Sequence, residues 1–179
     1  GFNGYGYGPS VNIDKIAQSG IYFSNTIAQS CWTLPSVTSI LTSRFVSAHQ
    51  VNTPNKKISD KEVTLAEILK LYGYRTAAFI CGGGISAGSG LNRGFDRYYY
   101  CPGGRPASAS PADILKPALK WLKRNKKRDF FLFLYTYAAR PVSDANRVVN
   151  SSLDPDKEAL KQRIADYDNG IRHEDESKK

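Results

Sequence analysis

Thr33 is the residue whose side chain and position in the sequence best suit a catalytic role. It stands in Trp32-Thr33-Leu34-Pro35-Ser36, and apolar residues follow at helical spacing. We therefore expect a helix to begin at Thr33, with Pro35 in its first turn, where a missing amide hydrogen costs nothing. A helix start favours anions, but a threonine hydroxyl attacks an ester only when a metal ion or base activates it. The plain alternative is an ordinary N-cap threonine.

The cysteines and glycines offer weaker chemistry. Cys31, Cys81 and Cys101 are an odd number without CxxC spacing, so they predict neither a zinc site nor a closed disulfide framework. Gly82-Gly83-Gly84 follows an expected strand but lacks the spacing of nucleotide-binding loops. We interpret residues 82–94 as a flexible surface connection.

The net charge of +9 favours anionic ligands, either phosphate or sulfate esters, nucleic acid or an acidic surface. Many of the cations lie between Lys116 and Arg128, at the end of an expected helix. Two interpretations stay open: a solvated helix face that suits the helix dipole, or a binding patch. His49 is expected to be a packing residue or to lie behind the site.

Helical and strand patterns alternate along the chain, which predicts an α/β layer with a mostly parallel sheet. A first helix should run from Ser10 to Gly20, with a strand over residues 21–27. The next helix should begin at Thr64 with a capping box to Glu67 and end at Gly73. Its expected buried face is Leu65, Ile68, Leu69 and Leu71.

The second half continues the alternation. Strand Arg75–Ile80 precedes a helix that begins near Ser110, and Pro117 should kink that helix or delay its start. Phe130–Tyr137 is predicted to be the most buried strand, followed by a helix over Ala159–Arg172. The apolar run at 130–139 is too short to span a bilayer, so we expect no membrane segment in this piece.

Several stretches, in order, resemble the sulfatase/alkaline-phosphatase superfamily. They are Asn12 to Ala17 (Asn-Ile-Asp-Lys-Ile-Ala), Trp32 to Ser36 with Leu41-Thr42-Ser43-Arg44 and His49, Thr64 to Tyr74, Gly94-Phe95-Asp96, Phe130 to Leu134, and Tyr167 to Asp175. The resemblance covers nearly the whole chain. It implies alkaline-phosphatase-like α/β/α layers with a mostly parallel sheet, and a single truncated sulfatase-like domain over residues 1–179.

The resemblance also implies site residues. Sulfatases convert a Cys within Cys-x-Pro-x-Arg, but Cys31 does not fit that spacing and Val37 stands where the Arg would be. Thr33, with Pro35 two residues later, resembles the nucleophile and metal ligand of the phosphoesterase and phosphotransferase branches. Arg140 stands near the family's substrate-side His and could hold an ester's oxygens.

The resulting prediction is a fragment of a metal-dependent hydrolase or transferase acting on an anionic small-molecule sulfate or phosphate ester. The metal, as Zn, Mn or Ca, would be held by Asp and His residues expected before Gly1 and after Lys179. We therefore expect this chain alone to be inactive. The alternatives are a non-catalytic basic domain that binds nucleic acid or an acidic partner through Lys120 to Arg128, although nucleic acid is disfavoured, and a family member with only a structural role.

Overall fold

The computed structural model describes residues 10–101 and 111–136. They fall into two units, residues 10–26 and Ile27–Thr136, and each is described by itself. The first unit holds helix α1, Val11–Ser19, which begins after Ser10 and ends before Gly20 as predicted. The predicted strand over residues 21–27 is wrong, because this segment is extended and bent without strand pairing. Without a neighbouring strand in the described part of the chain, the apolar alternation there cannot make a sheet.

The second unit is built on a three-stranded parallel sheet in the order β2-β1-β3. The strands are β1, Arg75–Ile80, β2, Arg97–Tyr100, and β3, Phe130–Tyr135. Ala78 of the central strand pairs with Tyr98 on one side and Phe133 on the other. All three strands therefore end at the same edge of the sheet.

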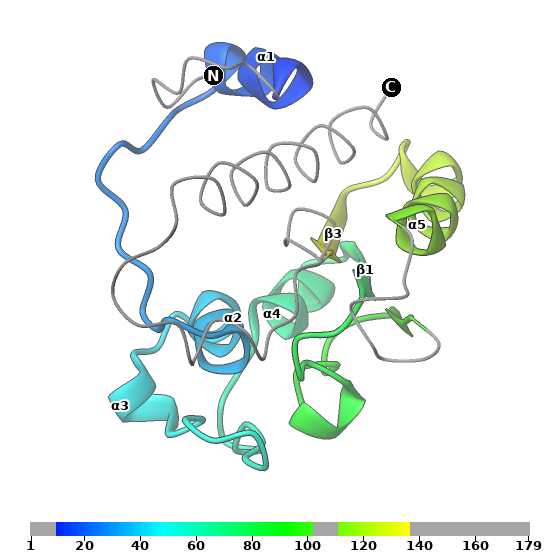
Figure 1. The fold of residues 1–179 in the computed structure, drawn as a ribbon. Helices are drawn as coiled ribbons and strands as arrows, with labels where there is room; N and C mark the ends of the chain where they lie inside the picture. The colour runs from blue at the N-terminus through cyan, green and yellow to red at the C-terminus, as the bar shows by residue number, and fades with distance from the viewer. Residues whose placement is uncertain (1–9, 102–110, 137–179) are drawn as a thin grey trace. The chain divides into compact units, whose positions relative to one another are not determined.

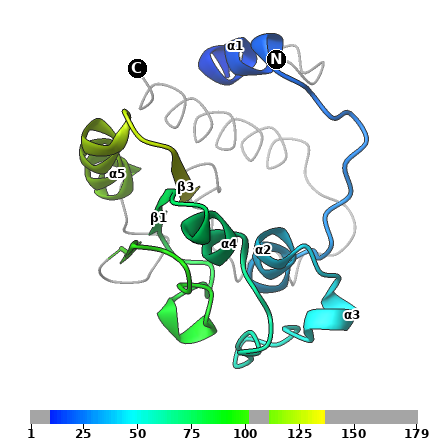
Figure 2. The same cartoon turned by 180° about the vertical axis from the view of Figure 1, so that it is seen from behind.

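Helices cover both faces of this sheet, as Figures 1 and 2 show. Helices α2, Thr33–Thr42, and α4, Leu65–Leu71, pack on the face that carries Ala78 and Ile80. Helix α5, Pro111–Asn125, packs on the face that carries Ala77 and Phe79. Alternate residues of β1 thus enter opposite cores. The predicted α/β/α layers with a parallel sheet are confirmed.

The most buried strand is β1, which corrects the prediction for the strand at Phe130. Every β1 residue after Arg75 is buried, whereas β3 is only partly buried and exposes 38% of Phe130 and 40% of Leu134. The reason is position: β1 has a strand on each side, while β3 pairs with β1 alone among the described strands. The apolar sequence of β3 indicates a strand, but it does not indicate whether that strand lies at the centre or at the edge of the sheet.

Helix α4 has the predicted ends but not the predicted buried face. The Thr64 side chain accepts from the Glu67 amide and Glu67 reaches back to Thr64, which completes the capping box, and Gly73 follows with a φ of +84°. Only Ala66 of the helix is buried, and Leu71 is 85% exposed. The small Ala66 side chain lets the helix approach closely, because Gly94 packs directly against the Ala66–Glu67 backbone.

The glycine-rich segment 82–94 is not the flexible connection expected from its composition. Ile85 and Leu91 are fully buried, and a short 3-10 helix, Ala87–Ser89, lies between them. Tyr98 donates a hydrogen bond to the Ile85 carbonyl. Buried apolar anchors thus hold a loop whose many glycines suggested freedom.

Other elements complete the described chain. Helix α3, Val46–His49, follows α2. Helix α5 begins at Pro111 with Pro117 inside it, so the start is not delayed. The helix predicted over Ala159–Arg172 lies outside the described residues. In the part of the chain that is described, no helix has the length and apolar character needed to cross a membrane.

Candidate active site

The Thr33 side chain lies where the strands end. Thr33 is the first residue of α2, and its Oγ1 is 2.8 Å from the Tyr135 hydroxyl at the end of β3. Either oxygen can donate this hydrogen bond. Both side chains are half-buried, so the Thr33 oxygen is neither sealed in hydrocarbon nor turned away from the sheet. In parallel α/β sheets, ligands bind outside the carboxyl ends of the strands.

A glycine brings the loop after β1 to the same place. A Cβ on Gly83 would lie 2.7 Å from Thr33 Cγ2 and 2.8 Å from Tyr135 Cε1. Real side chains do not approach that closely, and the φ of Gly83 is +77°. The Gly83 backbone therefore packs directly against both hydroxyl residues. The candidate site is thus built from the start of α2, the end of β3 and the loop after β1.

The start of α2 is not capped by Thr33. The N-cap position belongs to Trp32, whose backbone is extended and whose side chain accepts no capping hydrogen bond. The Thr33 hydroxyl contacts Tyr135 instead. The positive end of the helix dipole is therefore beside the Thr33 oxygen, where it can favour an anionic group. The N-cap alternative for Thr33 is wrong.

His49 holds the other end of α2 through a buried polar contact. The Val51 amide donates to His49 Nδ1 at 3.0 Å, so Nε2 carries the hydrogen and donates to Ser39 Oγ, also at 3.0 Å. Burial lowers the pKa of His49, although the nearby Glu62 carboxylate opposes this shift. His49 is therefore neutral and positions α2, in keeping with the predicted packing role.

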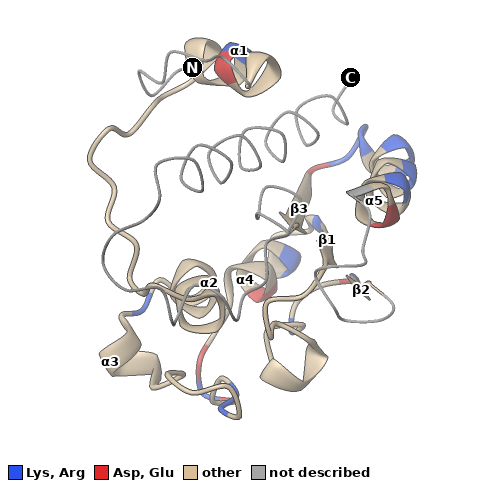
Figure 3. Cartoon of the chain, in the orientation of Figure 1, with Lys and Arg blue, Asp and Glu red and all other residues tan. Residues whose placement is uncertain are grey.

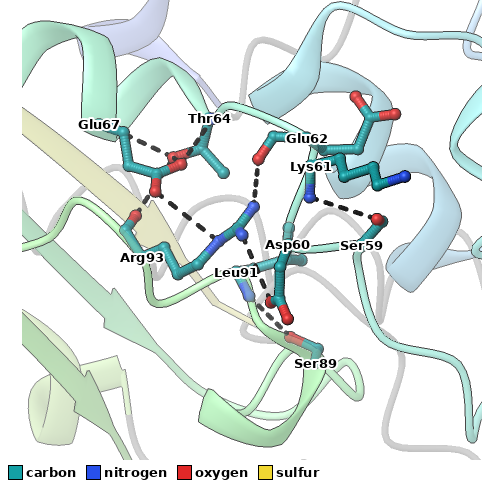
Figure 4. A network of polar contacts seen from close by, with 9 residues as sticks. All are labelled: Ser59, Asp60, Lys61, Glu62, Thr64, Glu67, Ser89, Leu91 and Arg93. Carbon is teal, nitrogen blue, oxygen red and sulfur yellow. Dashed lines mark hydrogen bonds and ion pairs between the residues drawn. The ribbon is translucent and has the colours of Figure 1, made fainter.

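A polar network fixes the far end of the glycine-rich loop, as Figure 4 shows. Arg93 donates to the Glu62 carbonyl, and its guanidinium lies 3.6 Å from Asp60 Oδ1 and 3.8 Å from Glu67 Oε1. The Thr64 hydroxyl donates to the Arg93 carbonyl. Arg93 Nε is buried without a hydrogen-bond partner and lies 3.8 Å from the Glu67 carboxylate, so this nitrogen costs free energy that the other contacts of the network offset. It joins the start of α4 to the loop that leads back from Gly83.

Gly94 and Asp96 also have structural roles. The Asp96 carboxylate accepts from the Thr76 amide and pairs with Lys70 at 2.9 Å. Burial alone would raise the pKa of Asp96, but the hydrogen bonds from Lys70 and Thr76 lower it. The Gly-Phe-Asp stretch therefore joins α4, β1 and β2 and supplies no group to the site.

The cations of the run from Lys116 to Arg128 lie away from the site. Figure 3 shows Lys and Arg in blue on α5 and on the connection to β3, as well as at scattered positions elsewhere. Lys123 and Arg124 occupy the last turn of α5, where they suit the helix dipole. This connection enters β3 at Phe130, whereas the site lies at Tyr135, about 17 Å away at the strand rise per residue. The basic run is thus at the opposite edge of the sheet.

The structure brings together only part of the predicted site. Thr33 lies at the ends of the strands, while Arg140 lies outside the described residues. The sequence does not indicate Tyr135 or Gly83 as site residues, because Tyr135 looks like one more residue of an apolar strand and Gly83 like one of several loop glycines. The hydrogen bond between Tyr135 and Thr33 joins positions 102 residues apart, and no local pattern indicates such a contact.

One family model covers nearly the whole chain. The model of the Sulfatase family matches residues 1–177. No curated protein sequence matches the chain. Among solved structures, the chain is similar to a putative sulfatase from Bacteroides thetaiotaomicron VPI-5482 (TM-score 0.73, 15% identity, 97% of this chain and 48% of that one).

Two other solved structures are also similar to the chain. One is the phosphonate monoester hydrolase of Agrobacterium radiobacter (TM-score 0.69, 14% identity, 94% of this chain and 52% of that one). The other is the C-terminal periplasmic domain of EcEptC from Escherichia coli in complex with Zn (TM-score 0.65, 17% identity, 98% and 52%). At these identities the likeness shows the fold alone. The chain spans about half the length of the solved structures it matches.

Proposed function

The chain belongs to the sulfatase family, and from that premise we propose that its protein is a hydrolase or transferase of sulfate or phosphate esters with Thr33 as nucleophile. The observation that supports the proposal is the position of Thr33 Oγ1 at the start of α2, beside the ends of β1 and β3. This is where the fold family binds ligands and where a helix dipole favours the ester's anionic oxygens.

Each residue of the site has a part in the proposed reaction. The Thr33 oxygen forms a bond to the phosphorus or sulfur, the bond from that atom to the ester oxygen breaks, and the leaving oxygen departs as an alcohol with a proton that balances the one lost by Thr33. Water, or an acceptor alcohol in a transferase, then takes the group from Thr33. Tyr135 holds the Thr33 oxygen at 2.8 Å, and Gly83 leaves the space that both side chains need.

A divalent metal, which the family resemblance implies, does not fit the described residues alone. Among residues 10–101 and 111–136, no three His, Cys, Asp or Glu side chains are grouped so that they could hold an ion. We propose that its carboxylate and imidazole ligands come from parts of the protein outside these residues. The zinc in the EcEptC domain makes zinc the first ion to test.

Arg140 is proposed to hold the ester's free oxygens. A guanidinium can donate two parallel hydrogen bonds to a sulfate or phosphate group, which gives both affinity and orientation. In the sequence, Arg140 follows the last residue of β3 by five positions, and Tyr135 at that strand end contacts Thr33.

The decisive test is turnover by the longest natural form of the protein that contains this chain. Aryl sulfate, aryl phosphate and aryl phosphonate monoesters should be assayed with added zinc or manganese. Thr33→Ala should lower kcat by at least about 1,000-fold, since it removes the attacking atom. Thr42→Ala, which removes a hydroxyl from the other end of α2, should leave kcat within about twofold. Equal activity of Thr33→Ala and unmutated protein would overturn the assignment.

A further inference from the structure

Two thiols lie side by side just beyond the ends of β1 and β2. Ile80 pairs with Tyr100 in the parallel register, and Cys81 and Cys101 are the next residues on each strand. The Cys101 amide donates to the Ile80 carbonyl at 2.8 Å, so the ladder continues to this point. Adjacent strands are about 4.8 Å apart. This spacing lies within the Cα separation of about 4.4 to 6.8 Å that a disulfide requires.

Both side chains face the core beneath α5. Each cysteine is 2% exposed, and they share a cluster with Phe79 and with Ile114 and Ala118 of α5. The thiols are close enough to hydrogen-bond to each other. The structure holds both as thiols, and the chain's third cysteine, Cys31, is exposed.

The surroundings of this pair exclude two other roles. Burial, together with the neighbouring Cys101 and Asp113 side chains, raises the pKa of Cys81 to about 11. Because the thiolate is the nucleophilic and metal-binding form, Cys81 is a poor nucleophile in the folded chain. No third metal ligand joins the pair within the described residues. Two buried neighbouring thiols without such roles can still be oxidised together.

We propose that Cys81 and Cys101 form a disulfide that joins β1 to β2 when the chain folds in the presence of a small-molecule disulfide. Each cysteine loses its hydrogen, one S–S bond forms between them, the S–S bond of the oxidant breaks, and two small thiols are released. The exchange occurs during folding or local opening, because the oxidant cannot reach thiols this buried. Once formed, the bond is protected from reductants by the same burial.

The disulfide would act on the loop that enters the candidate site. Cys81 precedes Gly83 by two residues, and Gly83 packs against Thr33 and Tyr135. The Cys81 amide donates a hydrogen bond to the Tyr135 carbonyl at 2.9 Å, which ties the start of this loop to β3. A covalent bond to β2 would therefore fix the start of this loop from its other side.

Mass spectrometry of the 179-residue chain tests this directly. The reduced chain is unfolded in denaturant, refolded in a buffer of oxidised and reduced glutathione, blocked with N-ethylmaleimide and digested with trypsin. We expect a disulfide-linked pair of peptides covering residues 76–93 and 98–120, and a thiol on Cys31 that is either blocked or glutathionylated. The same chain refolded with dithiothreitol should show all three cysteines blocked and no linked peptides.

A second measurement follows the effect on the fold. The denaturant midpoint of the oxidised chain should be higher than that of the reduced chain, and dithiothreitol added to unfolded protein should abolish the difference. Cys31→Ser should behave like the unmutated chain, whereas Cys101→Ala should show no redox-dependent shift. The proposal is overturned if Cys81 and Cys101 are recovered unlinked, or linked only to Cys31 or glutathione, from the unmutated refolded chain. That result needs no variant to fold.

Discussion

At the scale of single residues, the candidate site depends on two oxygens and one missing side chain. The Thr33 and Tyr135 hydroxyls are 2.8 Å apart, and Gly83 packs against both. A hydroxyl bonded at the start of a helix has a fixed direction, which an attacking oxygen needs. The contribution of these contacts to the free energy of unfolding can be measured without knowing the substrate.

The first prediction concerns the hydrogen bond between Thr33 and Tyr135. Tyr135→Phe and Thr33→Val each remove one hydroxyl, and the double variant should be less destabilised than the sum of the two. The coupling free energy should be about 0.5 to 1.5 kcal/mol, from denaturant unfolding of all four proteins. Thr42→Val, whose hydroxyl bonds to the Thr38 carbonyl of its own helix, should be additive with Tyr135→Phe. Additivity of the Thr33 pair would mean that the contact is not made in solution.

The second prediction separates packing at the site from backbone strain. Gly83 and Gly84 have φ values of +77° and +69°, so alanine is strained at either position by about 1 to 2 kcal/mol. A Cβ at Gly84 meets nothing within 4 Å, whereas one at Gly83 meets Thr33 and Tyr135. Gly83→Ala should therefore lower the free energy of unfolding more than Gly84→Ala. If the two variants lost equal free energy of unfolding, the predicted packing of Gly83 against Thr33 and Tyr135 would be wrong.

The three residues of the candidate site differ in how far the sequence alone predicts them. The place of Thr33 was predictable, because helical spacing and Pro35 are local signals. Tyr135 was not, since its role comes from a contact across the sheet. Gly83 stood in a run that suggested flexibility, and only its closeness to two side chains explains why a glycine is needed there.

At the scale of elements, local sequence signals predicted where helices begin and end better than which face of a helix is buried. The capping box of Thr64 and Glu67 and the stop at Gly73 were confirmed, because those bonds lie within a few residues. The apolar residues of α4 did not indicate its buried side, since a helix rich in leucine presents several candidate faces. Which face of α4 is buried depends on how the helix packs on the sheet. The burial of β3 likewise depends on its place in the sheet.

The third prediction concerns the contact between α2 and the segment after α3. His49 has a lowered pKa, so the unfolded chain takes up a proton near its ordinary value of about 6.5 while the folded chain does not. Its stabilising contribution is present above that pH and is lost as the pH falls toward the folded value. The free energy of unfolding should therefore fall between about pH 7 and 5.

The matched control for this prediction is His49→Gln. The variant should have a smaller change in unfolding free energy over the same pH range, even if it is less stable throughout. Nearby Glu62 opposes the shift, so Glu62→Gln should steepen the dependence. If an NMR titration gave His49 a pKa above its ordinary value of about 6.5, the result would contradict this account.

The basic run at the end of α5 favours a solvated helix face over the nucleic-acid alternative. Lys123 and Arg124 complement the helix dipole. Of the nearby aromatics, Phe131 is packed against the core, and only Phe130 is exposed by more than a third. Bases need displayed rings on which to stack.

At the scale of the whole molecule, we propose that the chain carries one side of a larger site. It spans about half of the solved structures it resembles. Strand β3, which pairs with β1 alone among the described strands, also exposes the apolar side chains of Phe130 and Leu134. Thr33 is present, while the described residues supply no metal ligand set. We therefore expect turnover only when the chain is part of the longer protein.

The measurement that tests the central claim most directly is the capture of the ester's group on Thr33. The longer protein is mixed with an aryl phosphate or aryl sulfate, quenched in acid within one turnover, and digested with trypsin. We expect a phosphoryl or sulfuryl group on the peptide covering residues 16–44, located at Thr33 by fragmentation and absent from Thr33→Ala. A modified residue other than Thr33 in an active enzyme, or turnover that persists in Thr33→Ala, would contradict the account.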